Sequence, residues 1–162
     1  MYASRPLEES DLDTICTFPQ NPEELRYFFP SASFPLTPDQ LRDKVATRAQ
    51  PTCIIYENEV VASANLYQIE ADSCYLGNVI VAPAFRGRGA AAFLLETMIS
   101  LVRAKYGVTV MKLICESSNT RGLLFYRKHG FLPVDLFGKQ SASGEIVVGI
   151  RMERRIEEGI CP

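Results

Sequence analysis

The order of apolar and polar residues along the chain predicts a mixed α/β fold with more strands than helices. Runs rich in β-branched and aromatic residues predict strands, whereas apolar residues that recur every three or four positions predict helices. About seven strands are expected, at residues 2–6, 53–56, 60–67, 75–82, 108–115, 131–137 and 146–152. About four helices are expected, and they begin near Glu8, at Pro38, near Gly89 and at Thr120.

The connections between these segments predict a mostly antiparallel sheet. Residues 57–59, 70–73 and 141–144 are short polar or glycine-containing turns, and each joins two strands directly, as in a hairpin. Residues 75–82 and 108–115 are instead joined by a helix. A strand–helix–strand unit of this kind makes its two strands parallel.

The helix of this parallel unit is expected to pack against the sheet. It carries apolar residues at helical spacing: Leu94, Leu95, Met98, Leu101 and Val102. Strand 75–82 is nearly all apolar after Asn78, so we expect it to be covered on both faces. Residues 27–38 are rich in aromatic residues and prolines, and no regular helix is expected there. Together the segments predict one α/β (α+β) domain over residues 1–162, with a central parallel strand–helix–strand unit.

Composition and charge argue against several classes of function. The chain has 162 residues, 47% of them hydrophobic, and a formal net charge of -2. Its basic residues are dispersed, so no nucleic-acid partner is expected. No apolar run approaches the ~18 residues of a membrane span, and residues 1–6 lack an apolar signal region, so no membrane partner is expected. The cysteines include no Cys-x-x-Cys pair, which argues against a metal or redox site and favours a reducing, cytoplasmic compartment.

The strongest chemical signal is the turn Arg86-Gly87-Arg88-Gly89-Ala90-Ala91, between a buried strand and a long helix. Its two glycines permit positive φ and close approach of a ligand to the backbone. Free N–H groups at the helix start, the positive end of the helix dipole and the two guanidinium groups would together bind an anion. All six residues are therefore candidate ligands of a diphosphate.

Three kinds of ligand fit a turn of this type. A nucleotide P-loop needs Gly-Lys-Ser/Thr, which is absent here. Residues 87–92 do fit the G-x-G-x-x-A pattern of dinucleotide-binding folds, but such a fold needs an acidic residue about 20 positions later and further strand–helix units. Glu116 is late for that role, and the predicted order of elements closes on a hairpin. The third ligand is coenzyme A, whose diphosphate would bind in the same way.

Two motifs resemble those of the GCN5-related N-acetyltransferase (GNAT) superfamily. Residues 86–91 match the family pattern Gln/Arg-x-x-Gly-x-Gly/Ala, and the preceding Val79-Ile80-Val81-Ala82-Pro83 is typical of it. Farther along, Asn119, Tyr126 and Gly130-Phe131 resemble the family's Asn…Tyr…Gly-Phe segment. Asn119 and Tyr126 lie two helical turns apart on nearly the same helix face, and Asn119 suits a helix cap. The order of elements extends the resemblance over nearly the whole chain.

The resemblance implies a fold, a reaction and a site. The fold would be a single GNAT-like domain with acetyl-CoA as co-substrate and no metal. The reaction would transfer the acetyl group to a primary amine of a small molecule or peptide, by direct attack in a ternary complex. Val79, Ile80 and Val81 would align the pantetheine arm, and Asn119 would help to hold this arm or the helix start. Tyr126 would contact the cofactor and protonate the departing thiolate.

Other points stay open at this level. Some family members carry a glutamate base at the position held here by Tyr75, and Glu70, Asp72 and Glu116 remain candidates beside a chain of waters. The missing glutamate supports an alternative function, a non-catalytic acyl-CoA-binding or regulatory module. The aromatic residues of segment 26–35 would either line the acceptor site or bury against the sheet. The identity of the amine, the use of other acyl groups and a homodimer are left open.

Overall fold

The computed structural model describes residues 1–157, and of the five cysteines Cys161 lies outside this range. Within the described residues, seven strands form one sheet. The order across the sheet is β1-β2-β3-β4-β5-β7-β6. The bounds are β1 (Tyr2–Pro6), β2 (Ala49–Tyr56), β3 (Glu59–Tyr67), β4 (Ser73–Val81), β5 (Val110–Glu116), β6 (Leu132–Gln140) and β7 (Ile146–Arg155). In this part of the chain β4 and β5 run parallel, and the other neighbouring pairs are antiparallel. The predicted mixed sheet with a central parallel unit is confirmed.

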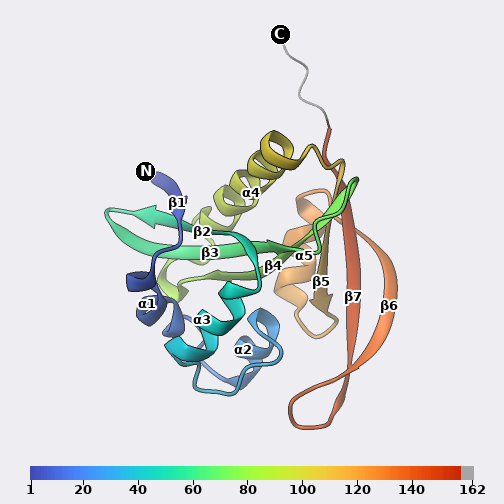
Figure 1. Cartoon of the computed structure of the whole chain (residues 1–162). Coiled ribbons are helices and arrows are strands. Elements are labelled where there is room, and N and C mark those ends of the chain that lie inside the picture. Colours follow the sequence, from blue (N-terminus) through green and yellow to red (C-terminus); the bar gives the residue numbers. More distant parts are fainter. Residues whose placement is uncertain (158–162) are drawn as a thin grey trace.

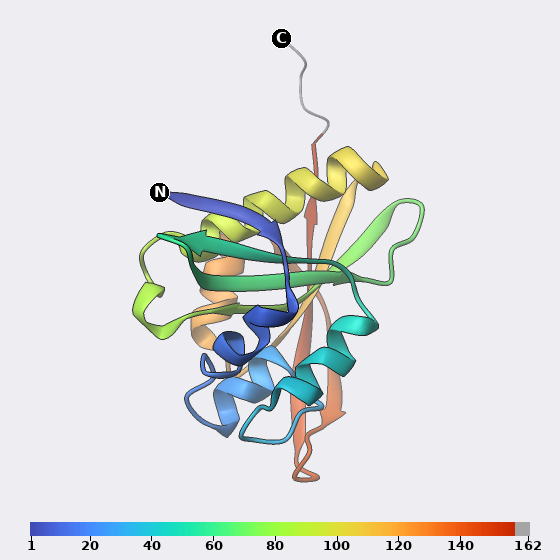
Figure 2. The same ribbon diagram turned by 60° about the vertical axis from the view of Figure 1, so that its left-hand side comes forward.

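Helices cover both faces of the sheet. Their bounds are α1 (Leu12–Cys16), α2 (Pro22–Phe28), α3 (Pro38–Ala46), α4 (Ala90–Tyr106) and α5 (Thr120–Lys128). Helix α4 lies along one face, while α1, α2 and α3 gather on the other (Figures 1 and 2). The described residues hold five α-helices where about four were expected. None of the helices within residues 1–157 has both the length and the apolar character needed to cross a membrane.

The additional helix is α2. Its last two residues, Tyr27 and Phe28, fall within segment 27–38, where no regular helix was predicted, so the prediction was wrong for these two residues. Asn21 caps α2, because its Oδ1 accepts a hydrogen bond from the N–H of Glu24 at 2.9 Å. Pro22 suits the first helical position that follows. A helix of 7 residues depends on tertiary packing for its stability. It is also too short to produce an apolar period that the sequence alone would reveal.

Two hydrophobic clusters hold the layers together. The first lies between the sheet and α4, which contributes the buried residues Ala90, Leu94, Leu95, Met98, Ile99 and Val102. Leu101, predicted on the same face, packs at the edge of this cluster, as do residues of α5. The second cluster joins α1, α2 and α3 to the opposite face of the sheet, where Cys53 and Ile80 are buried. Helices α4 and α5 therefore belong to one layer, and α1 to α3 belong to the other.

Strand β4 carries a bulge between Gly77 and Ile80, where Asn78 and Val79 lie opposite Ala64 of β3. Asn78 has a φ of 47°, and the pairing of β3 with β4 shifts register between Ser63 and Asn65. Both ends of the Asn78 amide are bonded: its Oδ1 accepts from Nδ2 of Asn65 at 2.9 Å, and its Nδ2 donates to the carbonyl of Phe28 at 2.9 Å. A bulge of this kind bends the strand and increases its twist.

Strand β4 separates from β5 after Tyr75, just before this bulge. Their parallel pairing joins Ser73–Tyr75 to Val110–Lys112 and stops there. The expectation that strand 75–82 is covered on both faces is therefore wrong, since Val79 and Val81 are partly exposed where the strands diverge. An apolar run could not reveal this opening, because it depends on the path of a neighbouring strand.

Replacing Gly77 with alanine is expected to destabilise the protein. A Cβ atom here would lie 2.9 Å from two ring carbons of Tyr67 and 3.0 Å from Oδ1 of Asn65, and forcing such neighbours apart costs about 1–3 kcal/mol. Gly138→Ala in β6 is the matched control, because its Cβ would meet Ile146 at an ordinary 3.5 Å. Denaturant unfolding measures both changes. Equal losses of stability in the two variants would contradict the steric account.

Candidate active site

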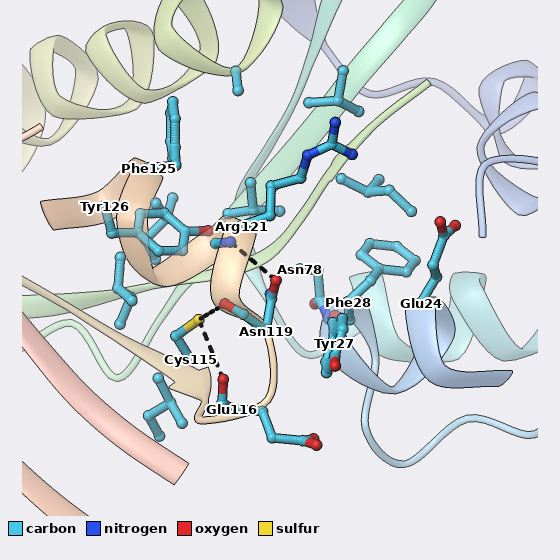
Figure 3. A pocket seen from close by; sticks show the side chains of 18 of the residues that line it. Glu24, Tyr27, Phe28, Asn78, Cys115, Glu116, Asn119, Arg121, Phe125 and Tyr126 are labelled. Atoms are coloured by element: carbon cyan, nitrogen blue, oxygen red, sulfur yellow. Dashed lines mark hydrogen bonds between the residues drawn. The ribbon is translucent and has the colours of Figure 1, made fainter. Parts of the chain in front are cut away.

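A cavity of about 890 Å³ opens where β4 and β5 separate. The start of α4 and the inner side of α5 line it on one face of the sheet, and α2 and the segment before β2 line it on the other. Figure 3 shows Phe125 and Tyr126 of α5 at one side of this space and Tyr27 and Phe28 of α2 at the other. Two ligands that enter from opposite faces of the sheet can therefore meet beside β4.

The turn before α4 has the geometry of an anion site. Gly87 and Gly89 have φ angles of 74° and 86°, so both glycines adopt the positive φ that the sequence indicated. The N–H of Phe93 donates to the carbonyl of Gly89 at 3.0 Å, which is the first hydrogen bond of the helix. The N–H groups of Ala90 and Ala91 therefore have no acceptor within the helix and lie at the positive end of its dipole. Gly87, Gly89 and Ala91 line the cavity.

The two arginines of this turn have different surroundings. Arg86 donates to both carboxylate oxygens of Glu24, at 2.8 Å and 3.2 Å, and to the carbonyls of Val81 at 3.2 Å and Phe18 at 3.3 Å. These bonds, first among several causes, hold the pKa of Glu24 below its ordinary value. Arg86 thus ties the turn to α2, although its side chain also lines the cavity. Arg88 is exposed and does not belong to the cavity lining within the described residues.

Arg121 is a cation at the cavity that the sequence analysis did not single out. It lies in the first turn of α5 and lines the cavity, and its side chain extends from the start of that helix (Figure 3). Its charge contributes to the lowered pKa of Glu24, after the larger effect of Arg86. The sequence feature that could have identified Arg121 was its position two residues after Asn119. This feature has little specificity, because an arginine in a first helical turn is common on any protein surface.

The edge of β4 that faces the opening carries backbone donors. The N–H of Ala82 donates to the carbonyl of Val61 in β3 at 2.8 Å. Donors alternate in direction along a regularly paired antiparallel strand, so the N–H group of Val81 faces away from β3 and toward the opening. Val79 lies in the bulge, next to this regular segment. Val79, Ile80 and Val81, all predicted as cofactor ligands, line the cavity.

Asn119 and Tyr126 lie on the α5 side of the cavity. The predicted helix cap at Asn119 is confirmed, because its Oδ1 accepts from the N–H of Gly122 at 3.0 Å (Figure 3). Tyr126 packs edge to face on Phe131, with ring centroids 5.8 Å apart, and both predicted residues line the cavity. Burial raises the pKa of the Tyr126 phenol well above its ordinary value. The hydroxyl therefore keeps its proton at neutral pH and can donate a hydrogen bond.

Cys115 also lines the cavity, but its thiol is poorly suited to nucleophilic attack. Its Sγ lies 3.8 Å from the carbonyl of Glu116 and 3.9 Å from that of Asn119. Burial raises the pKa of the thiol to about 12, and the protonated thiol is a weak nucleophile. Among residues 1–157, no group of three or more His, Cys, Asp or Glu side chains is arranged to hold a metal ion.

Of the three carboxylates considered as a general base, Glu116 lines the cavity. Arg26 donates to its two oxygens at 2.7 Å and 2.9 Å, and the hydroxyl of Ser118 donates at 2.8 Å. Burial by itself raises the pKa of Glu116, but the hydrogen bonds from Arg26 and Ser118 together bring it below its ordinary value. Glu70 and Asp72 lie in the turn between β3 and β4 and take no part in the lining that the structure describes.

The aromatic residues of segment 26–30 divide between the cavity and the core. Tyr27 lines the cavity, and its hydroxyl donates to the carboxylate of Glu23 at 3.0 Å. Phe29 is buried in the cluster beneath α1 to α3, and Phe28, also buried there, reaches the cavity wall. The burial that the sequence left open as one interpretation therefore holds for Phe28 and Phe29, whereas Tyr27 borders the cavity.

Comparison with protein families gives one match that covers most of the chain. The model of the Acetyltransferase (GNAT) family matches residues 14–131. No curated protein matches the sequence.

Solved structures of acetyltransferases resemble this chain over nearly its whole length. The ribosomal-protein-S18-alanine N-acetyltransferase from Escherichia coli is 19% identical, with 98% of this chain and 96% of that chain covered and a TM-score of 0.72. The spermidine N-acetyltransferase from Vibrio cholerae, in complex with CoA and spermine, is 18% identical, with 96% and 95% covered and a TM-score of 0.78. The protein yncA from Salmonella typhimurium, with its cofactor acetyl-CoA, is 16% identical, with 100% and 98% covered and a TM-score of 0.72. At these identities the likeness establishes the fold.

Arg26→Met is expected to destabilise the protein, because it leaves the buried carboxylate of Glu116 unpaired. Hydrogen bonds to charged groups contribute about 1.5–3 kcal/mol each, and Arg26→Met combined with Glu116→Gln should recover part of the loss. Glu116 has a lowered pKa in the folded state. The contribution of the pair is therefore complete above the unfolded pKa of about 4.3 and disappears as pH falls through the lower folded value.

Urea unfolding of wild type and Arg26→Met at about pH 7 and about pH 3 measures this dependence. The difference in stability between the two proteins should narrow at the lower pH. A difference that is unchanged by pH and by the second substitution would contradict the assigned pairing.

Proposed function

The chain belongs to the Acetyltransferase (GNAT) family and is an acyltransferase, and we propose that it transfers the acetyl group of acetyl-CoA to a primary amine of a small molecule or peptide by direct attack in a ternary complex. The observation that carries this proposal is the single cavity that crosses the sheet between β4 and β5. It joins an anion site on the face with α4 and α5 to an open wall on the face with α2. Cofactor and amine can thus reach one point from opposite faces.

The cofactor enters in this proposal from the side of α4. The N–H groups at the turn Arg86 to Ala91 bind the diphosphate, and the guanidinium of Arg121 contributes a positive charge that binds the diphosphate oxygens. Arg86 acts mainly by holding the turn against Glu24, since its donors are already bonded to protein groups. The presence of acetyl-CoA in yncA from Salmonella typhimurium and of CoA in the Vibrio cholerae enzyme supports the choice of cofactor.

The thioester lies at the opening between β4 and β5. The backbone N–H groups of Val79 and Val81 align the pantetheine amides and polarise the thioester carbonyl as negative charge develops on its oxygen. The nitrogen–carbon bond forms from the face with α2, and the carbon–sulfur bond breaks toward α5. Direct transfer is favoured over an acyl-cysteine route, because the thiol of Cys115 stays protonated.

Two proton transfers complete the reaction. Tyr126 donates the proton that the departing thiolate takes up, a role supported by its place on α5 in the cavity lining. The amine must lose a proton before or during attack. Glu116 lies on the amine side, but its pairing with Arg26 makes it a weak base. It is better suited to orient the amine, while water removes the proton.

The alternative is a module that binds acyl-CoA without transferring the acyl group. Its support is Tyr75, which stands where some family members carry a glutamate and which stacks on Tyr67 with ring centroids 4.9 Å apart. Thiol release from acetyl-CoA in the presence of a panel of amines separates the two functions. Binding of acetyl-CoA without thiol release for any amine would favour the module.

Tyr126→Phe is expected to lower turnover about 100-fold or more, the contribution typical of a general acid. Affinity for acetyl-CoA should stay nearly unchanged, because the ring and its packing on Phe131 remain. Thiol release measures turnover, and calorimetry measures affinity. Tyr106→Phe is the control, since this tyrosine bonds Gln50 away from the cavity. Equal turnover in Tyr126→Phe and wild type would remove Tyr126 from the mechanism.

Gly89→Ala is expected to weaken acetyl-CoA binding by about tenfold or more, the effect of losing about one charge-assisted hydrogen bond. An alanine disfavours the φ of 86° and shifts the N–H groups that follow. Gly107→Ala at the other end of α4 is the matched control, with a φ of 63° and no atom within 4 Å of the added carbon. Both variants should lose stability, but only Gly89→Ala should lose affinity in calorimetry. A similar loss of affinity in both variants would contradict the assignment of the turn before α4 as the site that binds the diphosphate.

A further inference from the structure

Arg48 lines the cavity on the face where the amine is proposed to enter. It follows the last turn of α3, where its N–H donates to the carbonyl of Val45 at 3.0 Å. Its guanidinium carbon lies 3.9 Å from the centre of the Tyr67 ring. Tyr67 in turn lies over Gly77 and stacks on Tyr75. The guanidinium is thus held against an aromatic ring at the edge of the cavity.

The charge of Arg48 has no counterpart within the part of the chain that the structure describes. Its Nη1 is buried and has no hydrogen-bond acceptor among residues 1–157, and it forms no ion pair with any of those residues. Burial accordingly lowers its pKa from the ordinary value. A buried cationic donor without an acceptor is unfavourable, and native proteins rarely keep one unless a ligand satisfies it.

The other charged groups at this end of the cavity do not compensate Arg48. The carboxylate of Glu116 is engaged by Arg26, and that of Glu23 accepts from the hydroxyl of Tyr27. Lys139 adds a further positive charge to the lining, and Lys44 is close enough to Arg48 for the two charges to repel. Glu23 keeps its negative charge, because the hydroxyl of Tyr27 is a neutral donor. Arg48, Lys139 and Lys44 outnumber this one carboxylate, so the net charge on this side favours an anion.

We propose that Arg48 binds a carboxylate of the acetyl acceptor, so that the acceptor is an amine that also carries a carboxylate, such as a free amino acid. This inference rests on the proposed function and names the class of its second substrate. A planar guanidinium matches a carboxylate in a bidentate geometry, and that of Arg48 forms no ion pair within residues 1–157. A polyamine would instead bring an ammonium group to an uncompensated cation.

Calorimetric titration of the CoA-loaded protein tests this inference without relying on turnover. One group of titrants carries a carboxylate: the common L-amino acids, β-alanine and 4-aminobutyrate. The other group lacks it and contains matched counterparts, such as phenethylamine for phenylalanine and cadaverine for lysine. At least one amino acid should bind about tenfold or more tightly than its partner without the carboxylate. Arg48→Gln should abolish this preference, and Arg48→Lys should retain part of it.

Arg42→Gln is the matched control, because Arg42 lies on α3 and pairs with Glu9 and Asp39 outside the cavity. It should leave binding unchanged. For an amino acid that is acetylated, Arg48→Gln should raise KM about tenfold to a hundredfold with little change in kcat. The melting temperature of Arg48→Gln should fall only modestly, because the contact with the Tyr67 ring is lost but no ion pair is broken. A purely structural arginine would change the melting temperature without changing the preference for a carboxylate.

The possible failures are distinguishable. Arg48-dependent binding of an amino acid without acetyl transfer would uphold the carboxylate site and reject the proposed transferase reaction. Transfer to amines that lack a carboxylate, with KM unaffected by Arg48→Gln, would overturn the carboxylate site and uphold the reaction. The absence of Arg48-dependent binding across the whole panel would overturn the carboxylate site.

Discussion

Parallel hydrogen bonding between β4 and β5 ends at Tyr75 and Lys112, and the rest of the site depends on that interruption. The bulge at Asn78 and Val79 bends β4, and where the strands diverge the outward N–H group of Val81 has no neighbouring strand to bond. Unpaired backbone donors inside a sheet are unfavourable unless water or a ligand satisfies them. The separation thus creates both the space for a ligand and the donors that would hold it.

Helix α2 fixes the walls of this opening at three points. Its last carbonyl, at Phe28, accepts from Asn78 at the bulge, Glu24 holds Arg86 at the turn before α4, and Arg26 holds Glu116 at the end of β5. Each bond joins α2 to a different border of the cavity. A short helix with little intrinsic stability therefore positions β4, the anion site and β5 relative to one another.

The arginines of the cavity fall into two groups by their partners. Arg26 and Arg86 are bonded to carboxylates, so their charges are compensated and they serve to hold the structure. Arg121 and Arg48 form no ion pair within residues 1–157 and lie on opposite faces of the sheet. Uncompensated charge at both ends suits a cavity that takes an anionic cofactor from one face and, in our proposal, an anionic amine from the other.

Local chemistry explains what the sequence determined by itself. Positive φ at Gly87 and Gly89 and the cap at Asn119 follow from the residues on either side of them, and the strand–helix–strand unit follows from apolar periodicity, so these features were predicted correctly. The bulge in β4, the short helix α2, the pairing of Arg86 with Glu24 and the uncompensated charge of Arg48 were decided by the tertiary structure. Each of them depends on contacts between residues far apart in the chain, and whether a charge is compensated depends on which partner folding brings within hydrogen-bond distance.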